Sequence, residues 1–350
     1  MNDTLRRCLD DLEARIDPQE EARLLAEWQA FSGGALTTGV FSPRRSRTIP
    51  PRVEWPKVSV NAALADYDAM ALQQFGGCSA QLAEAGGAIL NVRTNYGSSI
   101  APLLFGVEVF LMDEDLDTLP TSRPLNDRAA ICRLIARGVP DLRTGYGGQV
   151  MEMAALFLDI LAQYPNIGQH VRLYHPGLQG PMDICEVVWG STIFYAVRDE
   201  PGLVHDMLAL AVETYTAFLR AWERIVPFDP DGNTHWGFHH RGNIMLRDDS
   251  AMNFSPRMFD EFIGPYDQRL LDEFGGGAIH FCGKGDHYIA SMAQLRGLHA
   301  INLSQPHLND MEHVYRQTVD RGIKLLGLQR EAADAALAAG RDLHGQVHCW

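Results

Sequence analysis

The sequence predicts an α/β protein, specifically a (β/α)8 barrel with an N-terminal helical extension. Two observations support this. From residue 243 onward, short apolar runs typical of buried strands alternate regularly with helical patterns. Repeated β-then-α units imply parallel pairing, and seven or eight of them favour a barrel. A doubly wound open sheet is the alternative, and the absence of a glycine-rich nucleotide motif after any strand weakens a nucleotide-binding function.

Residues 1–60 form the predicted extension. Leu5, Leu9 and Leu12 recur at helical spacing, and Asp17-Pro18 ends that helix and begins a second one. Residues 42–57 are rich in proline and carry five basic residues, so we expect an extended arm. That arm is either a solvated connector or a lid that meets an anionic substrate or an acidic partner.

Residues 61–350 form the predicted barrel. In its first half we expect helices and strands whose boundaries are set by proline, glycine and apolar periodicity. The helices are predicted over residues 61–84, 149–164 and 201–224, with one more starting at Pro181, and the strands over Ala88–Val92 and Val171–Tyr174. Residues 103–112 are apolar and fit either a strand or a helix.

The second half carries the regular alternation. Strands are predicted at Asn243–Leu246, Ala278–Cys282, Ala300–Leu303, Lys324–Leu328 and Gln346–Cys349. The helices between them are predicted over residues 256–274, 286–295, 309–319 and 331–339. Ser255-Pro256 caps the first of these helices, because a serine followed by proline is typical of a helix start.

Composition excludes several classes of function. The net charge is −14, from 30 basic and 44 acidic residues, which argues against a nucleic-acid surface. No apolar run reaches the roughly 18 residues of a membrane span, and the N-terminus has no apolar signal core. Six irregularly spaced cysteines without a secretion signal indicate reduced thiols. We therefore expect a cytoplasmic protein, with a homodimer among the open oligomeric states.

His280 and Cys282 lie two residues apart on a predicted strand, so their side chains leave the same face. Imidazole and thiolate are good zinc ligands, and a third ligand would complete a catalytic site with one open position. Cys349, at the end of the last strand, can supply it, although His348 competes for that role. The alternative is that these cysteines are ordinary buried thiols.

Other polar side chains follow the predicted strands, where barrel enzymes keep their chemistry. The catalytic candidates are Arg247, Asp248 and Asp249, because a carboxylate there could orient His280 or accept a thiol proton. The substrate-binding candidates are Arg93, Asn95, Tyr96, His175, Gln179, Asn302 and Gln305. His239-His240 is expected at the surface.

Several stretches together resemble the uroporphyrinogen decarboxylase superfamily. They are Gly180–Asp183, Ile244–Ser250, Ser255–Tyr266, His280–Gly283 and Asn302–Pro306, with a looser likeness over Asn91–Gly106. The resemblance implies a (β/α)8 barrel over most of residues 85–350. The HxC…C arrangement resembles the zinc-dependent, coenzyme M methyltransferase-like branch, which implies His280, Cys282 and Cys349 as zinc ligands. It also implies a methylated corrinoid on a partner protein as donor and a small-molecule thiol as acceptor.

Two other functions remain open from the sequence. One is a metal-free decarboxylase or lyase acting on a polycarboxylate through Arg93, Arg247 and Asp249. The arginine-rich N-terminal stretch of the true decarboxylases does not match residues 42–57, which weakens that function. The other is a barrel that serves as a binding partner in a methyl-transfer assembly without turnover.

Overall fold

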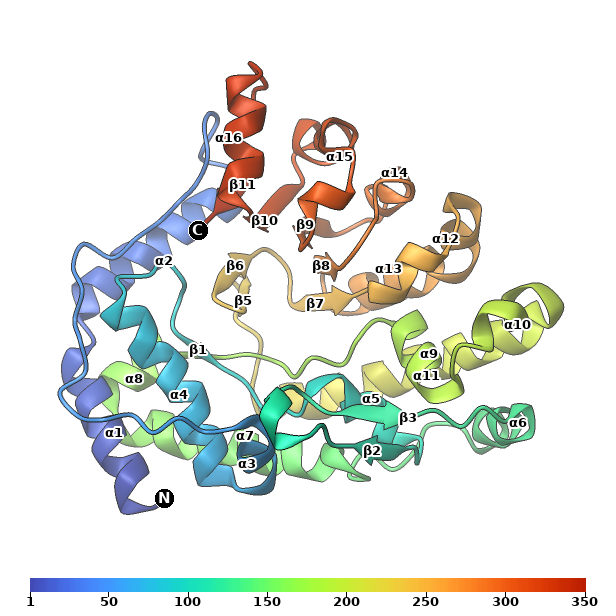
Figure 1. The fold of residues 1–350 in the computed structure, drawn as a ribbon, viewed down its shortest axis with the longest axis horizontal. Helices are drawn as coiled ribbons and strands as arrows, with labels where there is room; N and C mark the ends of the chain where they lie inside the picture. Colours follow the sequence, from blue (N-terminus) through green and yellow to red (C-terminus); the bar gives the residue numbers. More distant parts are fainter.

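A computed structural model describes residues 1–350 and has a mixed α/β architecture built on parallel strands. Five strands form one parallel sheet in the order β11-β10-β9-β8-β7, and β1 pairs with β4 in a second parallel pair. Their bounds are β1 Asn91–Val92, β4 Arg172–Leu173, β7 Ile244–Arg247, β8 Gly277–Phe281, β9 Leu298–Leu303, β10 Lys324–Leu328 and β11 Val347–Cys349. Helices surround these strands (Figure 1).

The hydrogen-bonded ladder does not run continuously around a ring, because no strand pairing joins β4 to β7 or β1 to β11. Other contacts cross the gap between β4 and β7 and extend the sheet beyond β11. Gly180 N donates to Arg247 O at 2.7 Å, and Met245 N donates to His175 Nε2 at 3.2 Å. On the far side, Phe41 forms a parallel bridge with His348. The predicted parallel α/β arrangement is confirmed, whereas eight continuously paired strands are not present.

The N-terminal extension packs as part of the core. The helices α1 (Asp3–Arg15) and α2 (Pro18–Ser32) match the prediction, and the Asp17 side chain caps α2. Trp28 and Phe31 of α2 share a hydrophobic cluster with strand residues such as Ala278. Figure 1 shows α2 beside the C-terminal strand β11. The extension therefore fills one end of the strand assembly.

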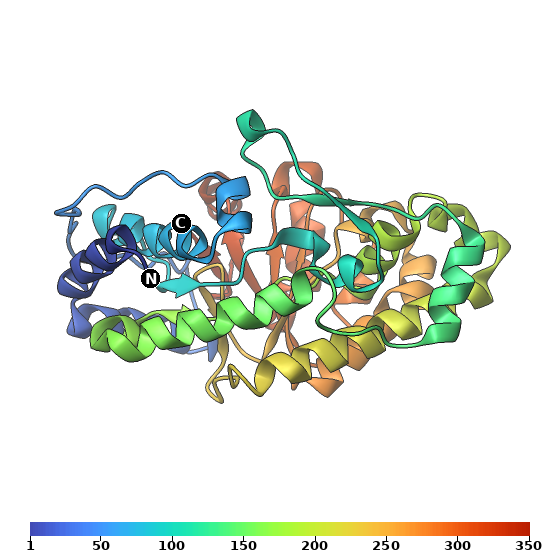
Figure 2. The same cartoon turned by 90° about the horizontal axis from the view of Figure 1, so that it is seen from below.

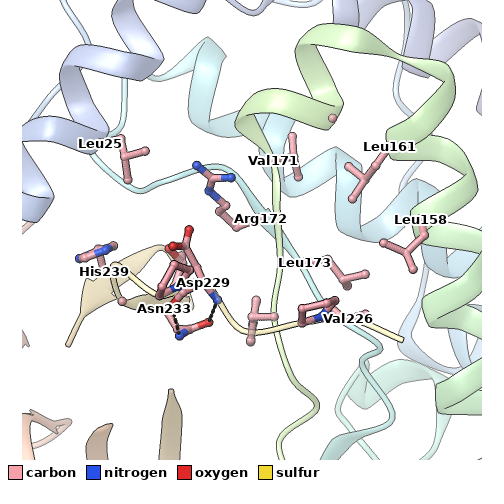
Figure 3. Close-up of a pocket in the computed structure, with 16 residues that line it drawn as sticks. Leu25, Leu158, Leu161, Val171, Arg172, Leu173, Val226, Asp229, Asn233 and His239 are labelled. Atoms are coloured by element: carbon pink, nitrogen blue, oxygen red, sulfur yellow. Dashed lines mark hydrogen bonds between the residues drawn. The ribbon is translucent and has the colours of Figure 1, made fainter. Parts of the chain in front are cut away.

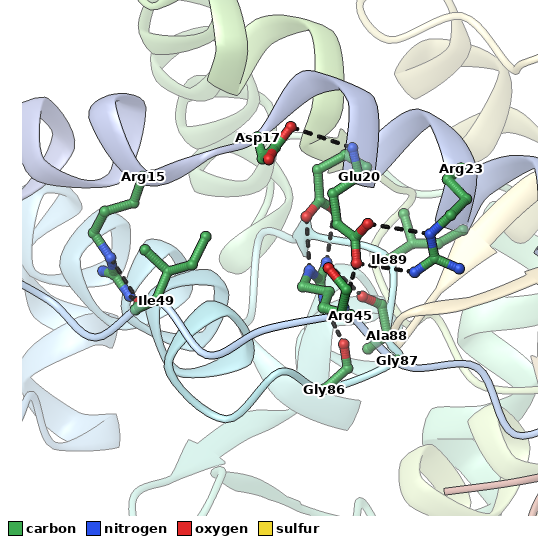
Figure 4. Close-up of polar contacts among 12 residues, drawn as sticks. Arg15, Asp17, Glu20, Arg23, Arg45, Ile49, Gly86, Gly87, Ala88 and Ile89 are labelled. Atoms are coloured by element: carbon green, nitrogen blue, oxygen red, sulfur yellow. Dashed lines mark hydrogen bonds and ion pairs between the residues drawn. The ribbon is translucent and has the colours of Figure 1, made fainter.

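The basic arm, residues 42–57, is anchored by one buried ion pair (Figure 4). Arg45 Nε and Nη2 donate to the two carboxylate oxygens of Glu21 at 2.6 and 2.7 Å. Arg45 also donates to Ala88 O at 3.0 Å. A buried guanidinium needs such full pairing, so Arg45 has a structural role, while the other four basic residues of the arm are exposed.

The remaining predicted helices are present, three of them divided or shortened, and α6, α8 and α10 were not predicted. Asp66 accepts a hydrogen bond from Ala69 N and so splits the predicted helix over 61–84 into two. The helix predicted over 256–274 breaks at Ile263, and that predicted over 286–295 shortens to α14. The bounds are α3 Val60–Ala65, α4 Tyr67–Ala83, α5 Ile100–Leu104, α6 Arg128–Arg137, α7 Tyr146–Gln163, α8 Pro165–His170, α9 Pro181–Trp189, α10 Ile193–Asp199, α11 Pro201–Glu223, α12 Pro256–Phe262, α13 Gly264–Glu273, α14 Ile289–Met292, α15 Met311–Gln317 and α16 Arg330–Ala338.

Two antiparallel hairpins interrupt the alternation. The strands β2 (Glu108–Phe110) and β3 (Thr121–Arg123) pair, and their connection projects from the molecule (Figure 2). Residues 103–112 therefore contain the end of α5 and all of β2. No helix of the chain combines the length and the apolar character that crossing a membrane requires.

The second hairpin joins β5 (Asn233–His235) to β6 (Phe238–His240) and lies in the middle of the molecule beside β1 and β7 (Figure 1). Its turn is Trp236-Gly237, with φ of +51° and +79°, which suits a two-residue hairpin. His239 and His240 are 3% and 1% exposed, so the prediction that they lie at the surface is wrong. The hairpin is internal, and an internal strand pair buries both of its faces.

Candidate metal centre

Asp249, His280 and Cys282 place one ligating atom each within 4.8 Å of one another. The Cys282 Sγ lies 3.3 Å from His280 Nε2, and Asp249 Oδ1 lies 3.6 Å from the same nitrogen. His280 is on β8, and Cys282 follows directly after that strand on the same face, as the spacing predicts. Asp249 follows two residues after the end of the neighbouring β7, whose Arg247 is paired in register with His280. The three groups meet where the parallel strands end.

Asn302 of β9 fixes the tautomer of His280. Asn302 Nδ2 donates to Leu326 O at 2.6 Å, so its Oδ1 is the atom that faces His280. The His280 Nδ1–H then donates to Asn302 Oδ1 at 2.7 Å. This leaves the lone pair of Nε2 directed toward Cys282 and Asp249. A histidine held in this way by a second hydrogen bond is the usual arrangement of a metal ligand.

The spacing of these atoms fits a zinc ion. Tetrahedral zinc with bonds near 2.0–2.3 Å places its ligands roughly 3.3–3.7 Å apart. The two distances to His280 Nε2, 3.3 and 3.6 Å, lie in that interval. A nitrogen, a sulfur and a carboxylate oxygen also match the ligand types that zinc accepts. Three protein ligands leave a fourth position open.

Backbone amides position the Asp249 carboxylate and the turn around it. Asp249 Oδ1 accepts a hydrogen bond from Cys282 N at 2.9 Å, and Arg247 Nη2 lies 3.4 Å from Oδ2. The N–H groups of Asp249 and Ser250 both donate to the Asp183 carboxylate, at 3.0 and 2.8 Å. Asp183, at the start of α9, therefore holds the segment that carries Asp249.

Burial controls the protonation of His280 and Cys282, the other two candidate ligands. Desolvation lowers the pKa of His280, which is 8% exposed, so the imidazole is neutral at neutral pH. Desolvation also raises the pKa of the half-buried Cys282 thiol. In the absence of a cation the centre therefore contains a neutral imidazole and a protonated thiol, and a metal would have to displace the thiol proton.

Cys349, the expected third ligand, is not brought to this cluster. Its side chain is fully buried in the main hydrophobic core, and the charged groups acting on its pKa, Arg330, Glu331 and Asp334, belong to α16. His348 faces the opposite way, as strand neighbours do, and packs among aromatic rings that include Trp28. Asp249 occupies the position near His280 and Cys282 that we expected Cys349 to fill.

Asp248 also points away from the centre. It is 2% exposed, and a Cβ atom placed on Gly180 would lie 2.1 Å from its Oδ1. The neighbouring carboxyls are Asp183 and Asp267, and burial raises the pKa of all three. Asp249 instead contacts Arg247 and the backbone of Cys282 through its carboxylate.

Four other candidates lie outside the cluster. His175 uses both ring nitrogens in hydrogen bonds, to Pro176 O at 2.8 Å and from Met245 N at 3.2 Å, and so links β4 to β7. Tyr96 is a fully buried core side chain beside Tyr146. Asn95 Oδ1 is buried without a partner, and Arg93 forms no ion pair. These residues therefore do not touch the candidate ligands.

Gln305 and Gln179 lie closer to the centre. Gln305 Oε1 accepts a hydrogen bond from Gly283 N and so holds the turn after Cys282. Gln179 shares a cleft of about 470 Å³ with Asp249. The charged residues of that cleft are Asp183, Glu186 and Asp249, and its lining contains no lysine, arginine or histidine. This cleft is the space through which a small molecule can approach Asp249.

Two residues that shape the centre, Trp236 and Asp183, were not among the site residues predicted from the sequence. Trp236, at the tip of the β5–β6 hairpin, lies edge-on to the His280 ring with centroids 5.2 Å apart. The Arg247 guanidinium lies 5.9 Å from the centroid of the same indole. The Trp-Gly pair between two short β-prone runs was the available signal for this turn. Asp183 lies in Gly180–Asp183, one of the stretches that carry the family resemblance, but nothing in the sequence connected it with Asp249.

Comparison with known proteins gives a likeness of fold. No protein-family model matches the chain, and no curated protein matches it. Among solved structures, a methyltransferase from Methanosarcina mazei matches with a TM-score of 0.62 and 15% sequence identity. The match covers 91% of this chain and 92% of that chain, so the likeness of fold extends over most of both chains.

Proposed function

We propose that this chain is a zinc-dependent methyltransferase that moves a methyl group from a methylated corrinoid on a partner protein to a thiol. The observation that carries the proposal is the convergence of Asp249, His280 and Cys282 at the strand ends. The fold shared with the Methanosarcina mazei methyltransferase supports it. The proposal keeps His280 and Cys282 as ligands and assigns the third position to Asp249 in place of Cys349.

Each residue has a separate task in this proposal. His280 contributes Nε2, which Asn302 keeps unprotonated, and Cys282 contributes its sulfur. Asp249 contributes Oδ1, while Arg247 partly neutralises its other oxygen. Zinc at this position would bind the acceptor thiol and lower its pKa, so that a thiolate exists at neutral pH. The thiolate would then take the methyl group from the donor, the electron pair of the broken bond would stay with the corrinoid, and the thiol proton would pass to solvent.

The proposal also includes the finer architecture. We propose that β1, β4 and β7–β11 belong to a (β/α)8 barrel of the uroporphyrinogen decarboxylase superfamily, in which the segment around Phe41 takes the place of a strand. The bridge between Phe41 and His348 supports this arrangement. A cytoplasmic location and a separate corrinoid-carrying partner are part of the same proposal.

The charge of the cleft beside Asp249 disfavours the alternative, a metal-free lyase of a polycarboxylate. Glu186 and Asp249 line this cleft together with Asp183, whose pKa is raised by burial, and no cationic side chain lines it. An anionic substrate there would meet like charges at close range, which is unfavourable in a partly desolvated space. The cleft is better matched to a neutral or cationic acceptor.

A direct assay tests the proposed reaction. Zinc-loaded protein is mixed with methylcobalamin and 2-mercaptoethanol, and the visible absorbance of methylcobalamin is followed. We expect zinc-dependent demethylation that falls to the uncatalysed rate in Cys282→Ser. A Cys185→Ser variant is the matched control, because Cys185 is fully buried on α9. Equal rates in the wild-type protein and Cys282→Ser would contradict the proposed role of the centre.

A further inference from the structure

A second cavity lies at the opposite ends of the strands from the metal centre. It has a volume of about 450 Å³ and is lined by residues around the start of β4, the start of β5 and the helices α2 and α7. That volume is within the range of small-molecule sites. Arg172, Asp229 and His239 lie on one side of it, with Leu158 and Leu161 on the other (Figure 3).

Two opposite charges line this cavity without neutralising each other. Arg172 and Asp229 each lack an ion-pair partner, although both are only partly exposed. The single hydrogen bond to the Asp229 carboxylate comes from Asp231 N at 3.0 Å. Asn233 holds this loop through hydrogen bonds to Asp229 O and to Asn243 Oδ1. The carboxylate is therefore positioned by the backbone, and it remains available to a ligand.

His239 adds a neutral acceptor next to Asp229. The Ser32 hydroxyl donates to Gln29 O, so it must accept from His239 Nδ1, which is 2.9 Å away. The proton is thus on Nδ1, and Nε2 has a lone pair and no hydrogen-bond partner. Burial lowers the pKa of His239 to about 4, which keeps the ring neutral at neutral pH. The cavity then offers one cationic donor and two acceptors.

The remaining wall is apolar. Leu25 of α2, Leu158 and Leu161 of α7, and Val171 line the cavity. Apolar side chains next to a few convergent polar groups are the usual composition of a site for a small amphiphilic molecule. A planar guanidinium is well suited to a carboxylate, which it can bind through two parallel hydrogen bonds.

We propose that this cavity binds an α-amino acid with an apolar side chain. The carboxylate of the ligand pairs with Arg172, and its ammonium group donates to Asp229 and to His239 Nε2. The side chain of the ligand packs against Leu158 and Leu161. This site is independent of the metal centre, because none of its residues contacts Asp249, His280 or Cys282.

Calorimetric titration of the full chain with three related probes tests the proposal. The probes are L-leucine, 4-methylpentanoate, which lacks the ammonium group, and 3-methylbutylamine, which lacks the carboxylate. We expect leucine to bind, and each of the other two to bind at least about ten-fold more weakly, because each leaves one partly buried charge of the site unpaired. No heat from leucine at millimolar concentration, or equal affinity for all three probes, would overturn the proposal.

Two variants locate the binding. Arg172→Gln and Asp229→Asn should each weaken leucine binding at least about ten-fold. The asparagine can still accept the hydrogen bond from Asp231 N, so the loop should keep its conformation. Arg257→Gln is the control, because Arg257 is exposed and unpaired on α12. Leucine binding that is unchanged in Asp229→Asn would show that the ligand lies elsewhere and would reject this site.

Discussion

Asn302 Oδ1 accepts a hydrogen bond from His280 Nδ1 at 2.7 Å, and this contact determines which ring nitrogen of His280 is available to a ligand. Asn302 cannot turn its amide around without losing the hydrogen bond from its Nδ2 to Leu326 O. The lone pair of His280 Nε2 is therefore preorganised beside Cys282 and Asp249 before any ion binds. Preparation of this kind is what a metal site requires.

Asn302→Leu should weaken zinc binding by about 10–100-fold, because His280 loses the partner that fixes its tautomer and orientation. Competition with a chromophoric zinc chelator measures the affinity. Asn302→Asp is the matched control: it retains an acceptor for Nδ1–H and should bind zinc more tightly than the leucine variant. Equal affinities in the wild-type protein and Asn302→Leu would show that this hydrogen bond does not serve a metal ligand.

Gly180→Ala should destabilise the fold. The backbone at Gly180, with φ of −79°, suits any residue, so the effect would be steric. An added Cβ would lie 2.1 Å from Asp248 Oδ1 and 2.8 Å from Arg247 O. We expect a loss of about 1–3 kcal/mol in the free energy of unfolding measured with urea. Gly202→Ala is the control: its added Cβ meets nothing within 4 Å, and it should be neutral or slightly stabilising. Equal effects in both variants would contradict the steric account.

Asp267→Asn should change how stability depends on pH. Burial, chiefly, raises the pKa of Asp267 to about 8, with Asp183 and Asp248 as its carboxyl neighbours. Folded Asp267 is then protonated between about pH 4 and 8, whereas the unfolded side chain ionises near pH 4. The wild-type stability from this group is fully present below pH 4 and falls as the pH rises to 8.

The asparagine removes this titration, so its advantage over the wild-type protein should grow between pH 5 and pH 8. Urea unfolding at both pH values measures it, and we expect a difference on the order of a few kcal/mol. The exposed residue Asp260 provides the control, because Asp260→Asn should leave the pH profile unchanged. Wild-type and Asp267→Asn curves that run parallel across this interval would contradict a protonated Asp267.

The parts of the fold that depend on local signals could be predicted from the sequence. Asp17-Pro18 begins a helix because the Asp17 side chain accepts hydrogen bonds from the first free backbone N–H groups and Pro18 suits the first helical position. This holds whatever the helix packs against. The five strands β7–β11 were recognisable as short apolar runs. His280 and Cys282 share a face because alternate residues of a strand always do. These predictions needed no knowledge of the neighbouring elements.

The parts that depend on long-range packing could not be predicted. The sequence does not indicate which of His348 and Cys349 points to the inside of the strand assembly. A shift of one residue in the strand register would exchange the two faces. Asp248 and Asp249 follow the end of β7 in a turn, so no strand periodicity indicates which of them contacts His280. The burial of His239 and His240 follows from the position of the β5–β6 hairpin inside the molecule, which only the assembled fold determines. Asn302 was expected to bind substrate, and its contact with His280 depends on the register between β8 and β9.

The most direct measurement is elemental zinc analysis of the wild-type protein, Cys282→Ser and Cys349→Ser, each purified without a histidine tag and offered zinc. The account predicts about one zinc per chain in the wild-type protein and in Cys349→Ser, and none in Cys282→Ser. Both variants exchange one cysteine sulfur for oxygen. Cys282 lies at the candidate metal centre, whereas Cys349 lies in the hydrophobic core. Full zinc content in Cys282→Ser, or its loss in a folded Cys349→Ser, would contradict a centre built from Asp249, His280 and Cys282.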